Sequence, residues 1–171
     1  MDSTAGHLLI ASPNLGDPNF DMTIVYMIEH NDEGALGVVV NRPTDTPVAD
    51  HLPALASMVS APEVFFVGGP VSSDHVIGVG RDRERITMID LDALMEGRIA
   101  RPDGFRLFAG YSGWSPGQLE GELAVGSWFV VEAFDGDVFG PEPTELWREV
   151  LRRQGGRIGR LSLYPDDPIF N

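Results

Sequence analysis

The chain has 171 residues and a formal net charge of −14, with 26 acidic and 12 basic side chains, and its length suits a single domain over residues 1–171. It has no cysteine, and all its basic residues are arginine, which excludes disulfides, thiolate metal sites, a lysine-containing phosphate loop and lysine Schiff bases. The strong acidity disfavours surfaces that bind nucleic acid or anionic membranes, so neither partner is expected.

Three β-rich segments open the chain, over residues 7–12, 22–30 and 35–41. The second and third are rich in valine, isoleucine and tyrosine, and the short turn from Asn31 to Gly34 joins them. This pattern predicts a β-hairpin, and with the first segment an antiparallel meander.

A proline-containing segment follows and is predicted to form a helix. Thr46 is the expected N-cap, Pro47 takes the first helical position, and Pro53 is expected to bend or split the helix. The apolar positions of this predicted helix are Val48, Leu52, Leu55 and Met58.

The middle of the chain alternates short strands and turns. Strands are predicted over residues 63–67, 76–80 and 86–89, and the segment 81–85, which alternates arginine and acid, is predicted as a solvated turn. A short helix is expected from Asp90 to about Gly97.

The last third alternates strands and helices. Strands are predicted over 105–109 and 128–133, and helices over 115–125 and 145–154. The final helix is expected to end at Gly155 and to bury Leu146, Trp147, Val150 and Leu151 on one face. Hairpins followed by interleaved helices indicate an α+β or mixed α/β fold.

The Gly-Tyr-Ser-Gly-Trp stretch around Ser112 comes closest to a hydrolase nucleophile motif. It lacks the final glycine, which is Trp114 here, and no histidine follows it in the chain. A helix start is the preferred interpretation, with Ser115 as N-cap, Gln118 as its capping-box partner, and Trp114 and Leu119 as a hydrophobic staple.

Polar residues are expected to gather at one edge of the meander. In an antiparallel arrangement the end of the first strand, the start of the second and the end of the third meet there. Arg42 is the only positive charge in the first eighty residues, so it suits an anion. Pairing with Asp17 or Asp21 to fix the loop is an equally good interpretation.

A ligand site is therefore expected at this edge, close to the Gly68-Gly69 pair. Backbone amides beside two glycines can hold an anion, and Arg42 offers a planar fork for carboxylate or phosphate. We expect Gly68 and Gly69 within about 15 Å of Arg42, a few strand spacings. The candidate ligand-binding residues are Ser12, Asn14, Asn41, Arg42, Gly68, Gly69, Tyr111 and Trp114.

Arginines concentrate near the end of the chain. Helical pairing with Glu145 and Glu149 explains much of this pattern. A DNA-contacting surface is the less favoured alternative, because no helix-turn-helix is evident. The arginines concerned are Arg148, Arg152, Arg153, Arg157 and Arg160.

Several blocks together resemble the AlgH/YqgE family of bacterial proteins, a group largely without assigned biochemistry. The resemblance implies an α+β fold with a bifurcated, partly barrel-like mixed β-sheet surrounded by helices. Some members are described as regulators of alginate synthesis and labelled transcriptional regulators. The matching blocks are Leu9–Pro13, Asp17–Phe20, Val25–Asn31, Gly34–Pro43, Gly68–Val71, Gly110–Trp114, Gly117–Glu120 and Trp147-Arg148.

The favoured function is a non-catalytic regulatory module that binds a protein or a small anionic ligand, since the motifs are mainly turns, caps and strand ends. A DNA-contacting regulator and an enzyme using carboxylates with Arg42 are the alternatives. No catalytic residue and no cofactor are assigned. No metal site is assigned either, because the histidines lack metal-ligand spacing. The chain starts without a basic leader and has no long apolar run, so a cytoplasmic location is expected.

Overall fold

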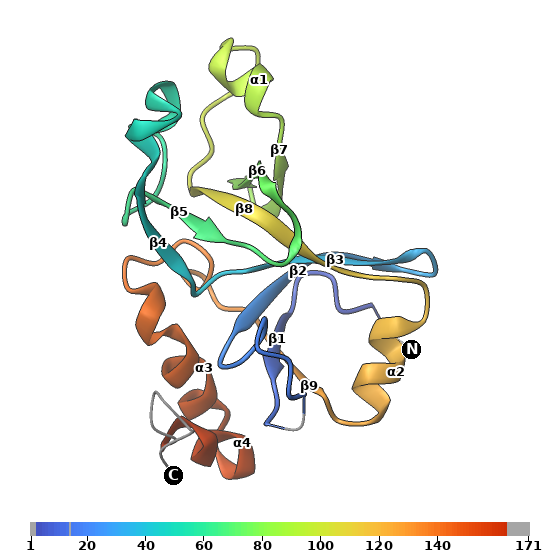
Figure 1. Ribbon diagram of the computed structural model, residues 1–171. Coiled ribbons are helices and arrows are strands. Elements are labelled where there is room, and N and C mark those ends of the chain that lie inside the picture. The colour runs from blue at the N-terminus through green and yellow to red at the C-terminus, as the bar shows by residue number, and fades with distance from the viewer. Residues whose placement is uncertain (1–2, 14, 164–171) are drawn as a thin grey trace.

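An antiparallel meander lies at the centre of the fold (Figure 1). The computed structural model describes residues 3–13 and 15–163, and in it β1 (Leu8–Ala11), β2 (Ile24–Asn31) and β3 (Gly34–Val39) pair in sequence. Alternate side chains of β1 enter two different apolar clusters, one on each face of the sheet. Because both faces are covered, β1 is apolar throughout, and the predicted meander is confirmed.

A long strand, β8 (Phe105–Trp114), splits the sheet into two branches. Its second half pairs antiparallel with β3, with Ala35 opposite Trp114. Its first half lies between β5 (Val64–Val67), which runs parallel to it, and β6 (Val71–Asp82), which runs antiparallel.

Three further strands complete a nine-stranded mixed sheet. β4 (Pro43–Pro47) pairs with β5, β7 (Arg85–Ile89) pairs with β6, and β9 (Trp128–Val131) pairs with β1. The main path runs β4-β5-β8-β3-β2-β1-β9, and β6 and β7 branch from β8. The fold is α+β with a curled, bifurcated sheet, as the family resemblance implied.

Helices cover both faces of the meander (Figure 1). α3 (Leu146–Gln154) buries the four predicted apolar residues against the cluster that contains Leu8, and α4 (Gly156–Arg160) follows it directly. α2 (Gln118–Ala124) packs Leu119 into the cluster on the opposite face. α1 (Leu91–Met95) confirms the short helix expected from Asp90, and the Asp90 side chain caps it by accepting a hydrogen bond from the Ala93 N–H. Over the described chain, no helix is long and apolar enough to cross a membrane.

The predicted helix from Thr46 is wrong. Residues up to Pro47 belong to β4, and two single 3-10 turns follow, over Val48–Asp50 and Pro53–Leu55. Pro53 has no N–H to continue a helix, and pairing with β5 draws Thr46 into the sheet. Val48 and Leu55 are nevertheless buried in a third apolar cluster. The apolar spacing therefore identified buried residues correctly, although those residues do not form a helix.

Other boundaries also differ from the predictions. β6 begins at Val71 rather than residue 76, because Val71 pairs with Tyr111 before an irregular stretch in which Ser72 has φ of 50°. Paired strands absorb most of the predicted 81–85 turn, leaving Arg83 and Glu84 as the turn. The Gly-Tyr-Ser-Gly-Trp stretch is the end of β8.

The predicted N-cap of the following helix is also wrong. α2 begins at Gln118, and Gly117 in the left-handed region is its N-cap. Ser115 lies outside the helix, although the Gln118 side chain does accept a hydrogen bond from the Ser115 N–H (3.0 Å).

Candidate functional site

The loop between β1 and β2 meets the end of β3 at one edge of the sheet. Asn41 links them: its Oδ1 accepts a hydrogen bond from the Ile24 N–H (2.9 Å), and its Nδ2 donates to the Met22 carbonyl (3.0 Å). Both polar functions of the Asn41 amide are therefore used to start β2 in register. The edge predicted from strand geometry exists, and Asn41 organises its backbone.

Arg42 is directed at the same loop. Its Nη1 donates to the Asn19 carbonyl (2.6 Å), and its Nη2 donates to the carbonyls of Asp21 (2.9 Å) and Pro18 (3.4 Å). Partial burial lowers the pKa of Arg42, while the nearby Asp21 carboxylate acts in the opposite direction. Arg42 thus fixes the loop, as the second interpretation proposed, but through main-chain carbonyls.

Gly68 and Gly69 lie beside Arg42, within the expected distance. The Val67 N–H donates to the Arg42 carbonyl (2.9 Å), and the Gly68 carbonyl accepts from the Val39 N–H (2.9 Å). A Cβ added to Gly68 would lie 2.3 Å from the Gly110 carbonyl oxygen, and one added to Gly69 would lie 2.3 Å from the Tyr111 backbone. The two glycines thus permit close approach of the β5–β6 link to β8.

Trp114 belongs to the apolar core. Its indole N–H donates to the Glu122 carboxylate (3.1 Å), which also accepts from the Trp128 indole (2.8 Å). The ring stacks on Phe20 with centroids 6.3 Å apart. Trp114 and Leu119 share one apolar cluster, in agreement with the predicted staple.

The remaining predicted residues are distributed around this edge. Ser12 is buried, and its hydroxyl donates to the Gly126 carbonyl (2.7 Å). Tyr111 is half-buried on β8 opposite Val71 and packs against the core cluster on the α3 side. Asn14 lies outside the described residues. Among the described residues of the predicted set, only Ser12 lines the cavity described next.

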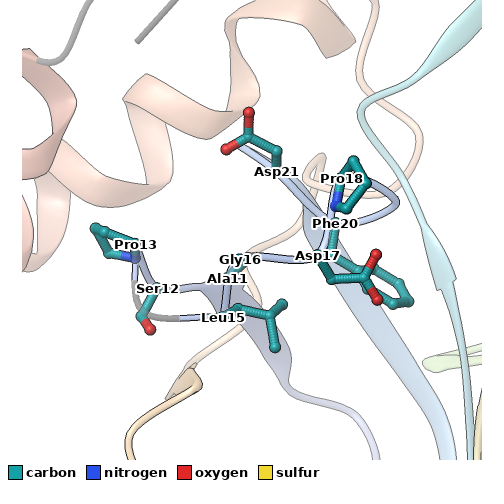
Figure 2. Close-up of a pocket in the computed structure, with 9 residues that line it drawn as sticks. All are labelled: Ala11, Ser12, Pro13, Leu15, Gly16, Asp17, Pro18, Phe20 and Asp21. Carbon is teal, nitrogen blue, oxygen red and sulfur yellow. The ribbon is translucent and has the colours of Figure 1, made fainter. Parts of the chain in front are cut away.

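A cavity of about 290 Å³ lies in the β1–β2 loop (Figure 2). Phe20 fixes one wall, because its ring also packs edge-on against Trp128 at 5.2 Å. The Asp17 carboxylate accepts a hydrogen bond from the Asn19 N–H (2.9 Å). The lining residues are Ala11, Ser12, Pro13, Leu15, Gly16, Asp17, Pro18, Phe20 and Asp21.

The two carboxylates of this cavity belong to Asp17 and Asp21. Figure 2 shows the Asp17 and Asp21 side chains pointing away from each other, from two arms of the loop. Within the described residues, no three histidine, aspartate or glutamate side chains converge in a group that could hold a metal ion. The cavity therefore offers separate polar contacts beside an apolar wall.

Sequence reasoning missed Leu15 and Phe20 as lining residues. The Asp17-Pro18-Asn19-Phe20 block is one of those that resemble the AlgH/YqgE family, and its aromatic residue inside a loop is the available signal. Its packing against Trp114 and Trp128, from distant segments, requires the tertiary structure.

Comparisons with known proteins agree over nearly the whole chain. A family model described as AlgH-like matches residues 8–159. A UPF0301 protein of Streptomyces avermitilis is 45% identical over 187 residues, covering 100% of this chain and 97% of the relative. A UPF0301 protein of Mycobacterium tuberculosis is 42% identical over 178 residues, covering 95% and 88%.

Two solved structures share the fold. A crystal structure of a protein from Corynebacterium diphtheriae superposes with a TM-score of 0.85 at 29% identity, covering 96% of this chain and 94% of that one. The solution structure of the AlgH protein from Pseudomonas aeruginosa gives a TM-score of 0.72 at 29% identity, covering 96% of each chain.

Proposed function

The chain belongs to the AlgH-like family, and from that premise we propose that it is a non-catalytic binding protein whose ligand site is the cavity in the β1–β2 loop. The observation that carries this proposal is the cavity of about 290 Å³ on a braced loop. Arg42 and Asn41, in the link between β3 and β4, hold its backbone, and Phe20 anchors it to two tryptophans. A braced loop of this kind presents its lining groups with little ordering cost on binding.

The lining favours a small ligand with a positive or hydrogen-bond-donating group. Asp17 and Asp21 supply carboxylates, and Leu15 and Phe20 supply apolar surface. An anionic ligand was expected from Arg42, but the Arg42 guanidinium donates to three loop carbonyls. We therefore propose an organic cation of a few carbon atoms, held by charge-assisted hydrogen bonds.

An NMR titration of the amide resonances tests the site. We expect 1,4-diaminobutane to shift the amides of residues 11–21, and butanedioate, its anionic counterpart, to leave them unchanged. Replacing Asp21→Asn should weaken diamine binding about tenfold, the equivalent of one charge-assisted hydrogen bond.

The control is Asp74→Asn, which removes a carboxylate that is 85% exposed on β6. Diamine binding to this variant should equal that of the unaltered protein. Shifts caused only by butanedioate would contradict the proposed ligand class, and the absence of shifts in residues 11–21 with either compound would contradict the site.

A further inference from the structure

α3 and α4 lie together at one end of the molecule (Figure 1), and three exposed arginines belong to these two helices. We call Arg152, Arg157 and Arg160 the basic end; all three side chains are exposed, and none forms an ion pair with a described residue. They form a concentrated positive charge on a chain whose formal net charge is −14.

The backbone keeps these arginines close together. A Cβ added to Gly159 would lie 3.5 Å from the Leu151 carbonyl oxygen and 3.7 Å from that of Arg152, so α4 packs directly against the end of α3. Arg157 and Arg160 are three residues apart on α4 and share one of its faces. Arg152 therefore lies beside the helix that carries the other two.

The other two arginines of this region are directed elsewhere. Arg153 forms a two-pronged ion pair with the buried Asp137 (2.6 and 3.0 Å), on the side of α3 that also carries Glu149. Arg148 donates to the Ser162 carbonyl (2.5 Å). Arg153 therefore pairs with Asp137, which lies outside α3, and not with a glutamate of its own helix as predicted.

An exposed apolar side chain adjoins the basic end. Leu163 is 81% exposed and ends the short turn Leu161–Leu163, which packs against both α3 and α4. A partner that matches this surface carries carboxylates for the arginines and an apolar residue for Leu163. The arginines of the basic end can attract a partner by charge, and Leu163 can add an apolar contact.

We propose that the basic end docks a short acidic segment of a partner protein, with an apolar residue of that segment against Leu163. The size of the partner decides between acidic occupants. A DNA duplex or an anionic bilayer extends beyond the basic end, so the negative charge on the rest of the protein surface repels it. A short segment can stay within about one Debye length (~8 Å) of the arginines, where their attraction dominates. This docking is independent of the proposed ligand cavity.

Fluorescence anisotropy with defined probes tests the docking. The probe is a labelled twelve-residue peptide of glutamate and leucine, titrated with the full chain at about 0.05 M salt, where exposed charges are weakly screened. The triple variant R152Q/R157Q/R160Q should bind the peptide about tenfold more weakly, as expected for three exposed ion pairs.

The matched control is R83Q/R85Q/R98Q, which removes three exposed arginines elsewhere and has the same net charge. This control should bind the peptide like the unaltered protein, and Leu163→Ser should weaken binding without changing its salt dependence. Equal loss in both triple variants would overturn the proposal, because net charge alone would then explain binding.

Two further probes examine the other polyanions. A 24-base-pair DNA duplex and vesicles containing phosphatidylserine should bind more weakly than the peptide under the same conditions. Tighter binding of either one through the same three arginines would overturn the choice of a protein segment.

Discussion

Arg106 lies at the start of β8 with 1% of its surface exposed. Its guanidinium donates to the carbonyls of Val138 (2.7 Å), Ala61 (2.6 Å) and Gly140 (3.2 Å). The group also lies 4.3 Å from the centroid of the Phe66 ring. Burial lowers the pKa of Arg106 to about 10. Like Arg42, this arginine joins separate loops to the sheet through main-chain carbonyls.

Replacing Arg106→Met should lower the free energy of unfolding by about 2–4 kcal/mol, because buried carbonyl oxygens lose their donors. Denaturant unfolding followed by circular dichroism measures this change. The Arg106→Lys variant keeps the positive charge, but a lysine ammonium cannot donate to three carbonyls in one plane. The free energy of unfolding of this variant should therefore also be lower. A methionine variant as stable as the unaltered protein would mean that the cost of burying the guanidinium cancels its hydrogen bonds.

Tyr26 makes stability depend on alkaline pH. Burial raises the pKa of the Tyr26 phenol, and the positive charge of Arg81 opposes this to a smaller extent. Above the ordinary value of about 10 the unfolded chain releases this proton while the folded chain keeps it, so stability falls as the pH rises.

Tyr26→Phe should therefore lose less stability between pH 8 and pH 10.5 than the unaltered protein. Urea midpoints at the two pH values give the comparison, and effects of other titrating groups are common to both proteins. Parallel pH profiles would show that the Tyr26 proton makes no contribution.

At the scale of elements, the start of α2 depends on a side chain inside the helix rather than on the expected N-cap. Gln118 accepts from the Ser115 N–H, and the Ser115 hydroxyl contacts the same Gln118 oxygen at 3.2 Å. The Gln118 amide also donates to the Glu122 carboxylate at 3.0 Å. Glu122 in turn holds both tryptophan indoles, so this small network connects the helix start to the core.

Gln118→Ala should therefore cost about 0.5–1.5 kcal/mol, as for a lost hydrogen bond. Ser115→Ala should cost less than about 0.5 kcal/mol, as for an ordinary surface substitution. Thermal unfolding of the two variants side by side measures the difference. A larger loss for Ser115→Ala would restore the predicted N-cap.

The junction of β5, β6 and β8 depends on the absence of side chains. Gly68→Ala would place a methyl group 2.3 Å from the Gly110 carbonyl oxygen, within a rigid sheet. We expect a loss of more than about 4 kcal/mol, or failure to fold, because backbone rather than a flexible side chain must shift.

The matched control is Gly121→Ala in α2, where an added Cβ meets nothing within 4 Å. This substitution should stabilise the protein by about 0.5–1 kcal/mol through helix propensity. Equal effects of the two substitutions on the melting temperature would contradict the close approach at Gly68.

At the scale of the whole molecule, two features act on every element: the bifurcated sheet and the excess of acid. Three apolar clusters lie around the two branches, and α2 and α3 cover opposite faces of the meander. A formal net charge of −14 opposes this compact arrangement by self-repulsion.

Raising the salt concentration from about 0.02 to 0.3 M should raise the melting temperature by about 2–4 °C, since screening weakens the repulsion. The double variant D50N/D74N, which removes two exposed carboxylates, should show a smaller rise. A melting temperature that falls with salt would mean that attractive ion pairs outweigh the repulsion.

Local patterns in the sequence were sufficient for the meander, the hairpin turn, the short helix after Asp90 and the buried face of α3. Each depends on neighbouring residues: a run of apolar, largely β-branched side chains in β2, a polar turn before Gly34, a helix start at Asp90, and apolar residues one turn apart in α3. The same patterns placed Asn41 and Arg42 at the right sheet edge, because strand direction follows from pairing in sequence.

Only the tertiary structure decided which groups Asn41 and Arg42 contact at this edge of the sheet. Apolar spacing after Thr46 fits a helix or two buried turns equally well, and pairing with β5 selected the turns. Arg42 could have met an anion, a carboxylate or a carbonyl, and the fold of the 18–21 loop supplied carbonyls. The cavity likewise depends on Phe20 packing against Trp114 and Trp128, which lie about a hundred residues away in the sequence. Sequence patterns indicate local periodicity, whereas these contacts join segments that lie far apart in the chain and meet only in the folded sheet.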